Sequence, residues 1–262
     1  KTMKQDTDFL VIGTGIAGLI YALEVSKFGK VLLITKTEMF HSATSLAQGG
    51  IASVSDRSDS FDSHIKDTLQ AGAGLCNTQI VDLCVHSAPL AIEQLIQHGV
   101  HFSKGSDSEK YHLTREGGHS HHRIYHFEDL TGKEISLRLI KAAKENENIE
   151  IREYLYAIDL ITAKKIKKNI FSDECVGCYA LDLKTNEIVT IRSKITFLAT
   201  GGVGKVYQYT SNPDIATGDG IAMAYRSGVP IVDMEFIQFH PTCLYHPQAK
   251  SFLISEALRG EG

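Results

Sequence analysis

The chain lacks the residues that mark several classes of protein. It has no tryptophan, only five prolines, and five cysteines scattered along 262 residues. An odd, scattered set of cysteines does not make a disulfide framework. Lysine and arginine total 27 against 31 for aspartate and glutamate, a formal net charge of -4. No charged tail stands out, so nucleic acid and anionic membranes are not favoured partners, and we expect a small-molecule ligand.

Long hydrophobic runs are also missing. The most apolar stretch, residues 9–25, contains three glycines and follows Asp8. A membrane-spanning helix needs about 20 apolar residues in a row, and a secretory leader starts with basic residues. We therefore expect a cytoplasmic protein.

A glycine turn near the start carries the first functional signal. Residues 8–12 have the pattern of a buried strand, GTGIAG follows at 13–18, and residues 19–28 are typical of a helix. The next strand is expected at 31–35. This strand, turn, helix and strand unit is the context in which GxGxxG predicts dinucleotide binding, whereas alone it would be an ordinary glycine turn.

Each glycine of the motif has a physical task. Gly13 permits a tight turn, Gly15 lets the backbone approach a pyrophosphate, and Gly18 allows close helix packing. The N–H groups and the dipole at the helix start favour phosphate charge. Thr14, Ile16 and Ala17 complete the predicted binding turn.

The end of the second strand departs from the nicotinamide-binding pattern. Thr35 and Lys36 stand where a ribose-binding acid is usual, with Glu38 beyond them. We expect Lys36 to face the adenosine or phosphate portion of a flavin dinucleotide. A second glycine turn at 199–202 follows the apolar strand 195–198, as in flavoproteins of the glutathione-reductase type. These features together indicate FAD.

The remaining pattern predicts an α/β fold. Residues 40–56 have the composition of a ligand-wrapping loop, and residues 101–128, rich in histidine, that of a functional loop. A lysine-rich solvated loop is expected at 164–168. Helices are expected at 60–71, 80–98 and 135–145, and strands at 150–160, 175–183 and 187–197, the last two forming a hairpin.

Two clusters of possible metal ligands do not have ligand spacing. Cys175 and Cys178 form a single CxxC in an expected strand and are interpreted as small apolar residues, with a metal or redox role as the alternative. The histidines at 119, 121, 122 and 126 have no partner pattern of carboxylates or cysteines. We expect no metal, and expect these histidines to shape the loop.

Several segments resemble the succinate dehydrogenase and fumarate reductase flavoprotein superfamily. The combination of HLTREGGHSHHR with LYHPQA is similar, within it, to the L-aspartate oxidase family. The superfamily segments are SATSLAQGG at 42–50, TGDGIA at 217–222, QFHPT at 238–242 and EALRGEG at 256–262, and the two family segments lie at 112–123 and 244–249.

The resemblance implies a fold, a domain division and a cofactor. It implies a Rossmann-like FAD-binding domain of the glutathione-reductase type with an antiparallel β insertion at 1–232, followed by the truncated start of a capping domain at 233–262. Membrane-bound relatives attach FAD through a histidine at the position of Ala43, so non-covalent FAD is expected. The cofactor-binding set is Gly13, Thr14, Gly15, Ile16, Ala17, Gly18, Lys36, Ala43, Thr44, Ser45, Leu46, Ala47, Gln48, Gly49, Gly50, Ala157, Thr200, Gly201 and Asp219.

The implied activity is oxidation of L-aspartate to iminoaspartate, with O2, giving H2O2, or fumarate as acceptor. This would be the first step of de novo NAD biosynthesis, with quinolinate synthase as a pathway partner. A soluble fumarate reductase or succinate dehydrogenase-type flavoprotein is the rival enzyme. A third hypothesis is an FAD-binding fragment that is inactive by itself, because the family's catalytic arginine and further substrate ligands are expected beyond residue 262.

Aspartate needs an anion for its ammonium group and donors for its two carboxylates. By resemblance, Glu116 orients the amino group, His240 and Ser255 donate to a carboxylate, and Glu256 and Arg259 form a proton-relay pair. The alternatives are a surface charge at Glu116, a satisfied core histidine at His240, and a plain surface ion pair between Glu256 and Arg259.

Overall fold

The computed structural model describes residues 3–105, 110–166, 174–240, 242–244, 246 and 252–254. The chain divides into two compact units, and each is described by itself. Unit 1 comprises residues 1–45, 139–241 and 245–252, and unit 2 comprises residues 46–138, 242–244 and 253–262. The boundary expected from the sequence, between a FAD-binding domain at 1–232 and a capping domain at 233–262, is not tested by this division and stays a prediction.

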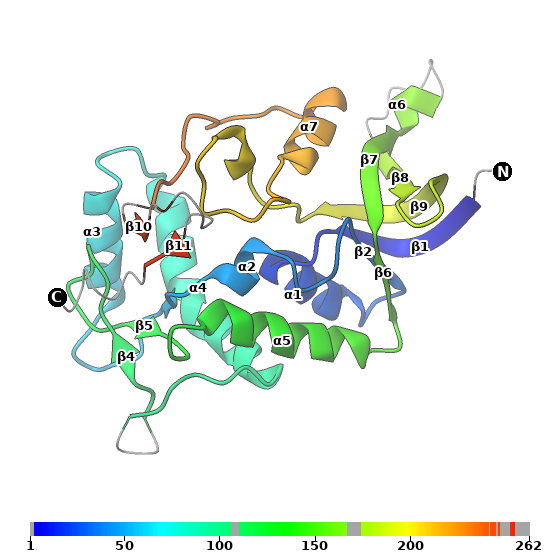
Figure 1. Cartoon of the computed structure of the whole chain (residues 1–262). Coiled ribbons are helices and arrows are strands. Elements are labelled where there is room, and N and C mark those ends of the chain that lie inside the picture. The colour runs from blue at the N-terminus through cyan, green and yellow to red at the C-terminus, as the bar shows by residue number, and fades with distance from the viewer. Residues whose placement is uncertain are drawn as a thin grey trace. The chain divides into compact units, whose positions relative to one another are not determined.

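Unit 1 is built on a six-stranded sheet whose parallel half continues into an antiparallel half (Figure 1). In spatial order its strands are β6 (Ile149–Glu153), β2 (Val31–Thr35), β1 (Met3–Ile12), β9 (Glu187–Leu198), β8 (Cys175–Asp182) and β7 (Leu155–Thr162). β1 pairs in parallel with β2 and β9, and β2 with β6. β9, β8 and β7 form an antiparallel meander.

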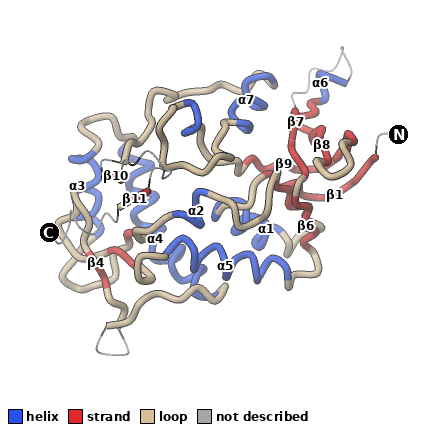
Figure 2. The backbone as a smooth tube through the Cα atoms, in the orientation of Figure 1, coloured by secondary structure: helices blue, strands red, loops and turns tan. Residues whose placement is uncertain are grey.

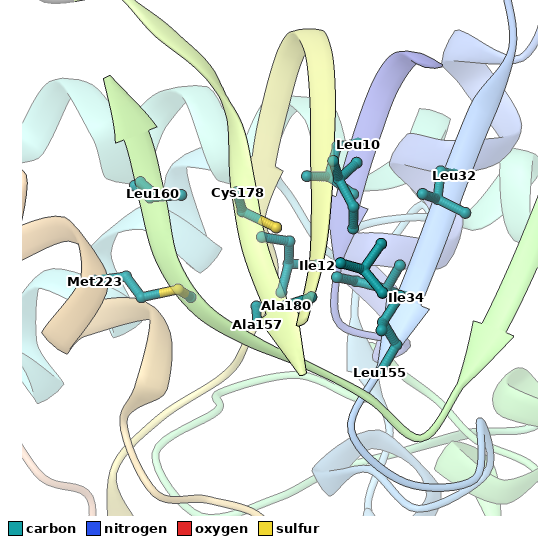
Figure 3. Packing of buried hydrophobic residues seen from close by; sticks show 12 residues of the cluster. Leu10, Ile12, Leu32, Ile34, Leu155, Ala157, Leu160, Cys178, Ala180 and Met223 are labelled. Atoms are coloured by element: carbon teal, nitrogen blue, oxygen red, sulfur yellow. The ribbon is translucent and has the colours of Figure 1, made fainter. Parts of the chain in front are cut away.

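The sheet curls so that its two halves pack on each other. Its edge strands β6 and β7 are consecutive in the chain and are separated only by Tyr154, at φ 61°. One residue cannot cross six strands spaced about 4.8 Å apart, so the edges must approach. Figure 3 shows the apolar cluster of this core, to which β1 and β2 contribute Leu10, Ile12, Leu32 and Ile34, β7 and β8 contribute Leu155, Ala157, Leu160, Cys178 and Ala180, and α7 (Asp219–Arg226) contributes Met223.

Helices cover this sheet in unit 1. α1 (Ile16–Val25) packs on β1 and β2, and α7 (Asp219–Arg226) packs on β7. Tyr21 of α1 stacks on Phe197 of β9 with ring centroids 3.9 Å apart. The remaining helical segments that lie wholly or partly in unit 1 are α2 (Ala43–Leu46), α5 (Thr131–Lys144), α6 (Ala163–Ile166) and a 3-10 turn at Gly204–Val206.

Unit 2 contains two longer helices and a small sheet (Figure 2). α3 (Phe61–Ala71) and α4 (Thr78–Gln97) contact each other. Their first turns are capped, because Ser60 Oγ accepts from Ser63 N and Asn77 Oδ1 accepts from Ile80 N. The sheet has the order β3-β5-β4, with β3 at Ile51–Ala52, β5 at Ile124–Tyr125 and β4 at Leu113–Thr114. β10 (Cys243–Leu244) pairs with β11 (Phe252–Leu253), of which only Leu253 belongs to unit 2.

Most elements expected from the sequence are confirmed, including the α/β class and the hairpin between β8 and β9. The strand predicted at 150–160 was wrong in one respect, because Tyr154 divides it between β6 and β7. The solvated loop predicted from residue 164 was wrong for residues 164–166, which belong to α6, while 167 and 168 lie outside the described residues. The ligand-wrapping loop contains α2 and β3. In the part of the chain that the structure describes, no helix is long and apolar enough to cross a membrane.

A pair of isoleucines on β9 tests the importance of the curled core. Ile191 is 0% exposed within the apolar cluster, and Ile195 is 47% exposed on the same strand. Ile191→Ala should lower the free energy of unfolding by about 2–5 kcal/mol, because it removes buried methyl groups and leaves a cavity. Ile195→Ala should cost less than about 1 kcal/mol, since its side chain stays largely in water. Urea unfolding of both variants measures this difference, and equal losses would contradict the proposed core.

Candidate functional site

The turn after β1 is closely packed in unit 1. Gly13 has φ +113°, and a Cβ there would lie 2.3 Å from the Ala199 carbonyl oxygen. A Cβ on Gly18 would lie 2.0 Å from the Gly13 carbonyl oxygen. Only glycine fits these two contacts, which bring the turn, the start of α1 and the end of β9 together.

The start of α1 lines a cavity with Gly15, Ile16 and Ala17. Gly15 is the N-cap and provides no side-chain cap. The Ile16 N–H is bonded to Thr44 Oγ1 at 3.0 Å. The first N–H groups of a helix have no intrahelical acceptor, and the helix dipole adds positive potential there. This end of α1 is therefore suited to an anion such as a phosphate.

The cavity has a volume of about 590 Å³ and lies wholly in unit 1. Its walls are mainly apolar, with a few convergent polar groups, as is typical of cofactor sites. Predicted cofactor residues that line it are Gly13, Thr14, Gly15, Ile16, Ala17, Lys36, Ala43, Thr44, Ala157, Thr200, Gly201 and Asp219.

One wall of the cavity carries a fixed charge pair. Lys36 Nζ donates to Thr217 Oγ1 at 2.7 Å and forms a short ion pair with Asp219 Oδ2. Tyr156 donates its hydroxyl to Asp219 Oδ1 at 3.2 Å. Burial, and then the negative charge of Asp219, raise the pKa of Tyr156, so this hydroxyl stays a donor. The carboxylate is thus held in one orientation at the cavity wall.

The residues present fit an extended dinucleotide. A Cβ on Gly201 or Gly202 would meet no protein atom within 4 Å, although both glycines line the cavity. The backbone there leaves open space that a flat or extended ligand can approach. The donor end of α1, this bare backbone and the Asp219 carboxylate offer separate contacts to phosphates, ring and sugar hydroxyls.

A second, smaller cavity lies in unit 2. Its volume is about 240 Å³, and Gln48, Gly49, Thr114, Glu116, His126, Glu128 and Asp129 line it. Three of these residues are carboxylic acids. Such a concentration of negative charge favours a cationic group in the cavity.

Glu116 lies directly against the glycine segment that follows α2. A Cβ on Gly49 would meet Glu116 Oε1 at 2.8 Å. Gln48 Nε2 donates to the Leu253 carbonyl oxygen at 3.0 Å. The carboxylate of Glu116 therefore occupies space that only a glycine at position 49 leaves available.

A histidine pair stands beside this cavity. His126 Nδ1 lies 3.2 Å from the Glu128 carbonyl oxygen, which can only accept a hydrogen bond. His126 Nε2 lies 2.8 Å from His112 Nδ1. In the neutral ring, the proton of His126 is on Nδ1, and Nε2 accepts from His112. The sequence pattern gave no signal for this pair beyond its richness in histidine.

Arg123 is a buried charge that sequence reasoning missed. Its side chain is 0% exposed. Nε donates to Asp59 Oδ2 and Nη2 donates to Asp59 Oδ1, both at 2.8 Å, and Nη1 donates to Asp67 Oδ2 at 2.7 Å. His119 Nδ1 lies 3.3 Å from Nη1 and accepts from it, because a guanidinium only donates. The expectation that the four histidines shape the loop stays a prediction. Among the residues described, no group of histidine, cysteine and acidic side chains could hold a metal ion.

The same cluster predicts a loss of stability in mildly acidic solution. Burial, and then the charge of Arg123, lower the pKa values of His64 and His119. As pH falls through about 6.5, the unfolded chain binds these protons first, so the free energy of unfolding falls. His119→Asn should make unfolding between pH 7.5 and 5.5 less pH-dependent, as measured by denaturant titration at each pH. An unchanged slope in the variant would contradict this assignment.

Other predicted site residues lie elsewhere. Gly18 is buried behind the turn, and His240 is half-buried in unit 1. Gly50 would place a Cβ 2.2 Å from the Tyr125 carbonyl oxygen. Ser255, Glu256 and Arg259 lie outside the described residues. Ser45 belongs to unit 1, and Leu46, Ala47, Gln48, Gly49 and Gly50 belong to unit 2, where Gln48 and Gly49 join Glu116 at the second cavity.

Comparison with known proteins gives consistent matches along the chain. The family described as FAD binding domain matches residues 8–262. The L-aspartate oxidase of Vibrio cholerae serotype O1 is 51% identical over 263 residues, which cover 99% of this chain and 49% of that protein. A chloroplastic L-aspartate oxidase of Oryza sativa subsp. japonica is 46% identical, covering 97% of this chain and 40% of the relative.

Solved structures match over the same extent. Quinol fumarate reductase of E. coli superposes with a TM-score of 0.90 at 33% identity, covering 100% of this chain and 43% of that chain. A flavocytochrome c3 fumarate reductase gives a TM-score of 0.82 at 26% identity. The chain spans about half the length of the curated relatives that it matches.

Proposed function

Because the chain belongs to the FAD-binding domain family, which matches residues 8–262, we propose that the protein acts as an L-aspartate oxidase. It would oxidise L-aspartate to iminoaspartate and pass the electrons to O2, giving H2O2, or to fumarate. The observation that carries the proposal is identity of about half the residues with L-aspartate oxidases over nearly the whole chain. The acidic cavity around Glu116 gives this substrate a physical basis, because aspartate differs from succinate by an ammonium group.

The cavity of unit 1 would hold the FAD. The N–H groups at the start of α1 would stabilise the pyrophosphate charge, and the glycines at 13, 15 and 18 permit its approach. Asp219, fixed by Lys36 and Tyr156, would accept hydrogen bonds from a sugar hydroxyl. We propose that FAD is held non-covalently, because Ala43 has no nucleophilic atom at the position where membrane-bound relatives use histidine.

The second cavity would bind the amino group of the substrate. A carboxylate at Glu116 attracts the ammonium group and accepts its hydrogen bonds, which orients the α-carbon. Bound flavin would supply the two-electron acceptor for oxidation at that carbon. His240 and Ser255 would donate to a substrate carboxylate, and Glu256 and Arg259 would move protons. We carry these four roles over by resemblance.

Three wider points stay proposals. The first is a place at the first step of de novo NAD biosynthesis, with quinolinate synthase as the partner that consumes the product. The second is the capping domain expected from residue 233. The third is a cytoplasmic location, expected from the sequence; the rice relative is named chloroplastic.

A fumarate reductase of the soluble type is the second candidate. The fold agreement with quinol fumarate reductase favours it. Its dicarboxylate substrate has no ammonium group, so the carboxylate of Glu116 would have no cationic group to pair with in that substrate. The two candidates therefore predict opposite preferences between aspartate and succinate.

Turnover by the full-length protein with FAD tests the proposal. We expect H2O2 from L-aspartate in air, and little reduction of an artificial acceptor by succinate. Succinate oxidation faster than aspartate oxidation would overturn it in favour of the second candidate. The 262-residue chain with added FAD is the matched sample for the fragment hypothesis, and peroxide above background from that chain would refute that hypothesis.

A further inference from the structure

Arg123 and its two aspartates form a charged cluster to which the proposed mechanism assigns no role. The side chain of Asp59 is 1% exposed and that of Asp67 is 15% exposed, while Arg123 is fully buried. Removing such charges from water costs several kcal/mol per ion, so buried ion pairs are weak evidence for stability. A cluster of this kind is better explained by the geometry that it fixes.

The cluster fixes one loop of unit 2. Residues 115–123 connect β4 to β5, which pair through Thr114 and Ile124. Glu116 lies two residues after β4, and Arg123 directly precedes β5. Gly117 and Gly118 follow Glu116, and a Cβ on either would meet no atom within 4 Å. Gly117 and Gly118 therefore provide no side-chain contacts that would fix the backbone of the loop at this point.

The far arm of this loop is tied to α3. Ser120 donates from its backbone N at 2.9 Å and from Oγ at 2.7 Å to Asp67 Oδ2, the same oxygen that accepts from Arg123. Burial would raise the pKa of Asp67, but the hydrogen bonds from Ser120 and Arg123 outweigh it and lower that pKa to about 2. The anchor therefore stays charged throughout the neutral range.

The backbone of Arg123 also ties the end of this loop to β3. The Arg123 carbonyl oxygen accepts from Ser53 N at 2.9 Å, which extends the pairing of β3 with β5. β3 follows Gly50 directly, so Arg123 also locates the glycine segment on which the Glu116 carboxylate rests. The backbone N–H of His119 donates to the Glu116 carbonyl oxygen at 3.2 Å, which closes the turn that follows Glu116.

We propose that the Arg123–Asp59–Asp67 cluster is a positioning device for Glu116, which holds its carboxylate over Gly49 and so determines how well the protein selects a substrate carrying an ammonium group. This inference rests on the proposed function. Asp67 and Ser120 are positioning residues, because they act through the loop and touch neither cavity.

A double-mutant cycle in the full-length flavoprotein tests the coupling. Asp67→Asn keeps the side-chain shape and leaves Arg123 paired with Asp59. It should lower kcat/KM for L-aspartate about tenfold, a coupling in the range of residues that share one hydrogen-bond network, and leave fumarate reduction within about twofold. In the Glu116→Gln background the same change should have almost no further effect on aspartate. Equal losses for both substrates, or full losses in both backgrounds, would overturn the proposal.

Two further samples keep the result interpretable. Ser120→Ala removes one contact to Asp67 from an exposed side chain, so it carries the test should Asp67→Asn fold poorly, and the same pattern is expected at smaller size. Asp82→Asn is the matched control, since the side chain of Asp82 is exposed and forms a surface pair with His86 on α4. It should leave both activities unchanged.

Hydrogen exchange separates this proposal from the proposed function. Asp67→Asn should speed amide exchange in residues 115–120 and leave α4 unchanged, whereas Asp82→Asn should not affect that loop. If the wild-type protein does not oxidise aspartate, the proposed function fails, and the exchange result still decides whether the cluster positions Glu116. Unchanged exchange in the loop would overturn the positioning proposal whatever the substrate.

Discussion

Glu116→Gln is expected to lower kcat/KM for L-aspartate oxidation by about one to two orders of magnitude, with fumarate reduction by the same preparation preserved. Glutamine keeps the side-chain length and removes the charge that pairs with the substrate ammonium group. A hydrogen bond to a charged group contributes about 1.5–3 kcal/mol, which corresponds to that loss. Initial rates of peroxide formation and of fumarate reduction, on the full-length protein with FAD, measure the two activities.

Glu93→Gln on α4 is the matched control for this substitution. Glu93 is exposed and lies outside both cavities, so both activities should stay at the wild-type level. If Glu116→Gln leaves both activities unchanged, Glu116 is a bystander and the substrate assignment rests on similarity alone. If it lowers both equally, Glu116 supports the fold or the cofactor and does not select the amino group.

Gly49→Ala offers a steric version of the same experiment. The new Cβ would meet Glu116 Oε1 at 2.8 Å, and the flexible end of that side chain can move away. The charge is kept and its position is changed. Activity toward aspartate should therefore fall in the same direction, and flavin absorbance of the purified variant shows whether the loss arises from cofactor binding instead.

The parts of the fold that follow from local pattern were predictable. The turn at 13–18 was recognisable because the glycines stand between an apolar strand and a helix. The structure confirms both elements, although α1 begins at Ile16, three residues before the predicted start. A helix can begin directly at a glycine turn when its first N–H groups find acceptors elsewhere, as Ile16 does at Thr44.

The curl of the sheet was not predictable from periodicity. Residues 150–160 form one continuous strand pattern, yet Tyr154 takes a positive φ and sends the chain to the opposite edge. A tyrosine gives no local signal for that conformation. Here its hydroxyl donates to Glu38 Oε1 at 3.0 Å, a contact between residues 116 positions apart. Tertiary packing of this kind overrides the local pattern.

The same limit applies to the candidate site. Lys36 and Asp219 were each named from their motifs, but their ion pair across 183 residues appears only in the fold. Arg123 was part of the histidine-rich segment, and nothing in its neighbours indicates that it is fully buried. Of its partners, Asp59 lies just before α3 and Asp67 lies on α3, and both are far from Arg123 in the sequence.

The turn at the start of α1 gives the second large prediction. Gly18→Ala should weaken FAD binding by about 10- to 100-fold or more and lower the free energy of unfolding by about 1–3 kcal/mol. The new Cβ would lie 2.0 Å from the Gly13 carbonyl oxygen and 3.2 Å from Ala199 Cβ. Backbone atoms cannot yield as a flexible side chain does, so the start of α1 must move away from the turn and take its N–H donors with it.

Two other glycines separate the effects of packing and of cofactor contact in that experiment. Gly117→Ala adds a Cβ that meets nothing within 4 Å and lies in unit 2, so FAD affinity and stability should both stay unchanged. Gly202→Ala adds a Cβ that meets no protein atom but lies at the cavity of unit 1, so it should weaken FAD binding without a loss of stability in the cofactor-free protein. Titration of the apoprotein with FAD, followed by flavin fluorescence, and urea unfolding without FAD measure the two quantities. Full FAD affinity in Gly18→Ala would show that the cofactor does not depend on the close approach of α1 to the turn, and the phosphate site would have to lie elsewhere in the cavity.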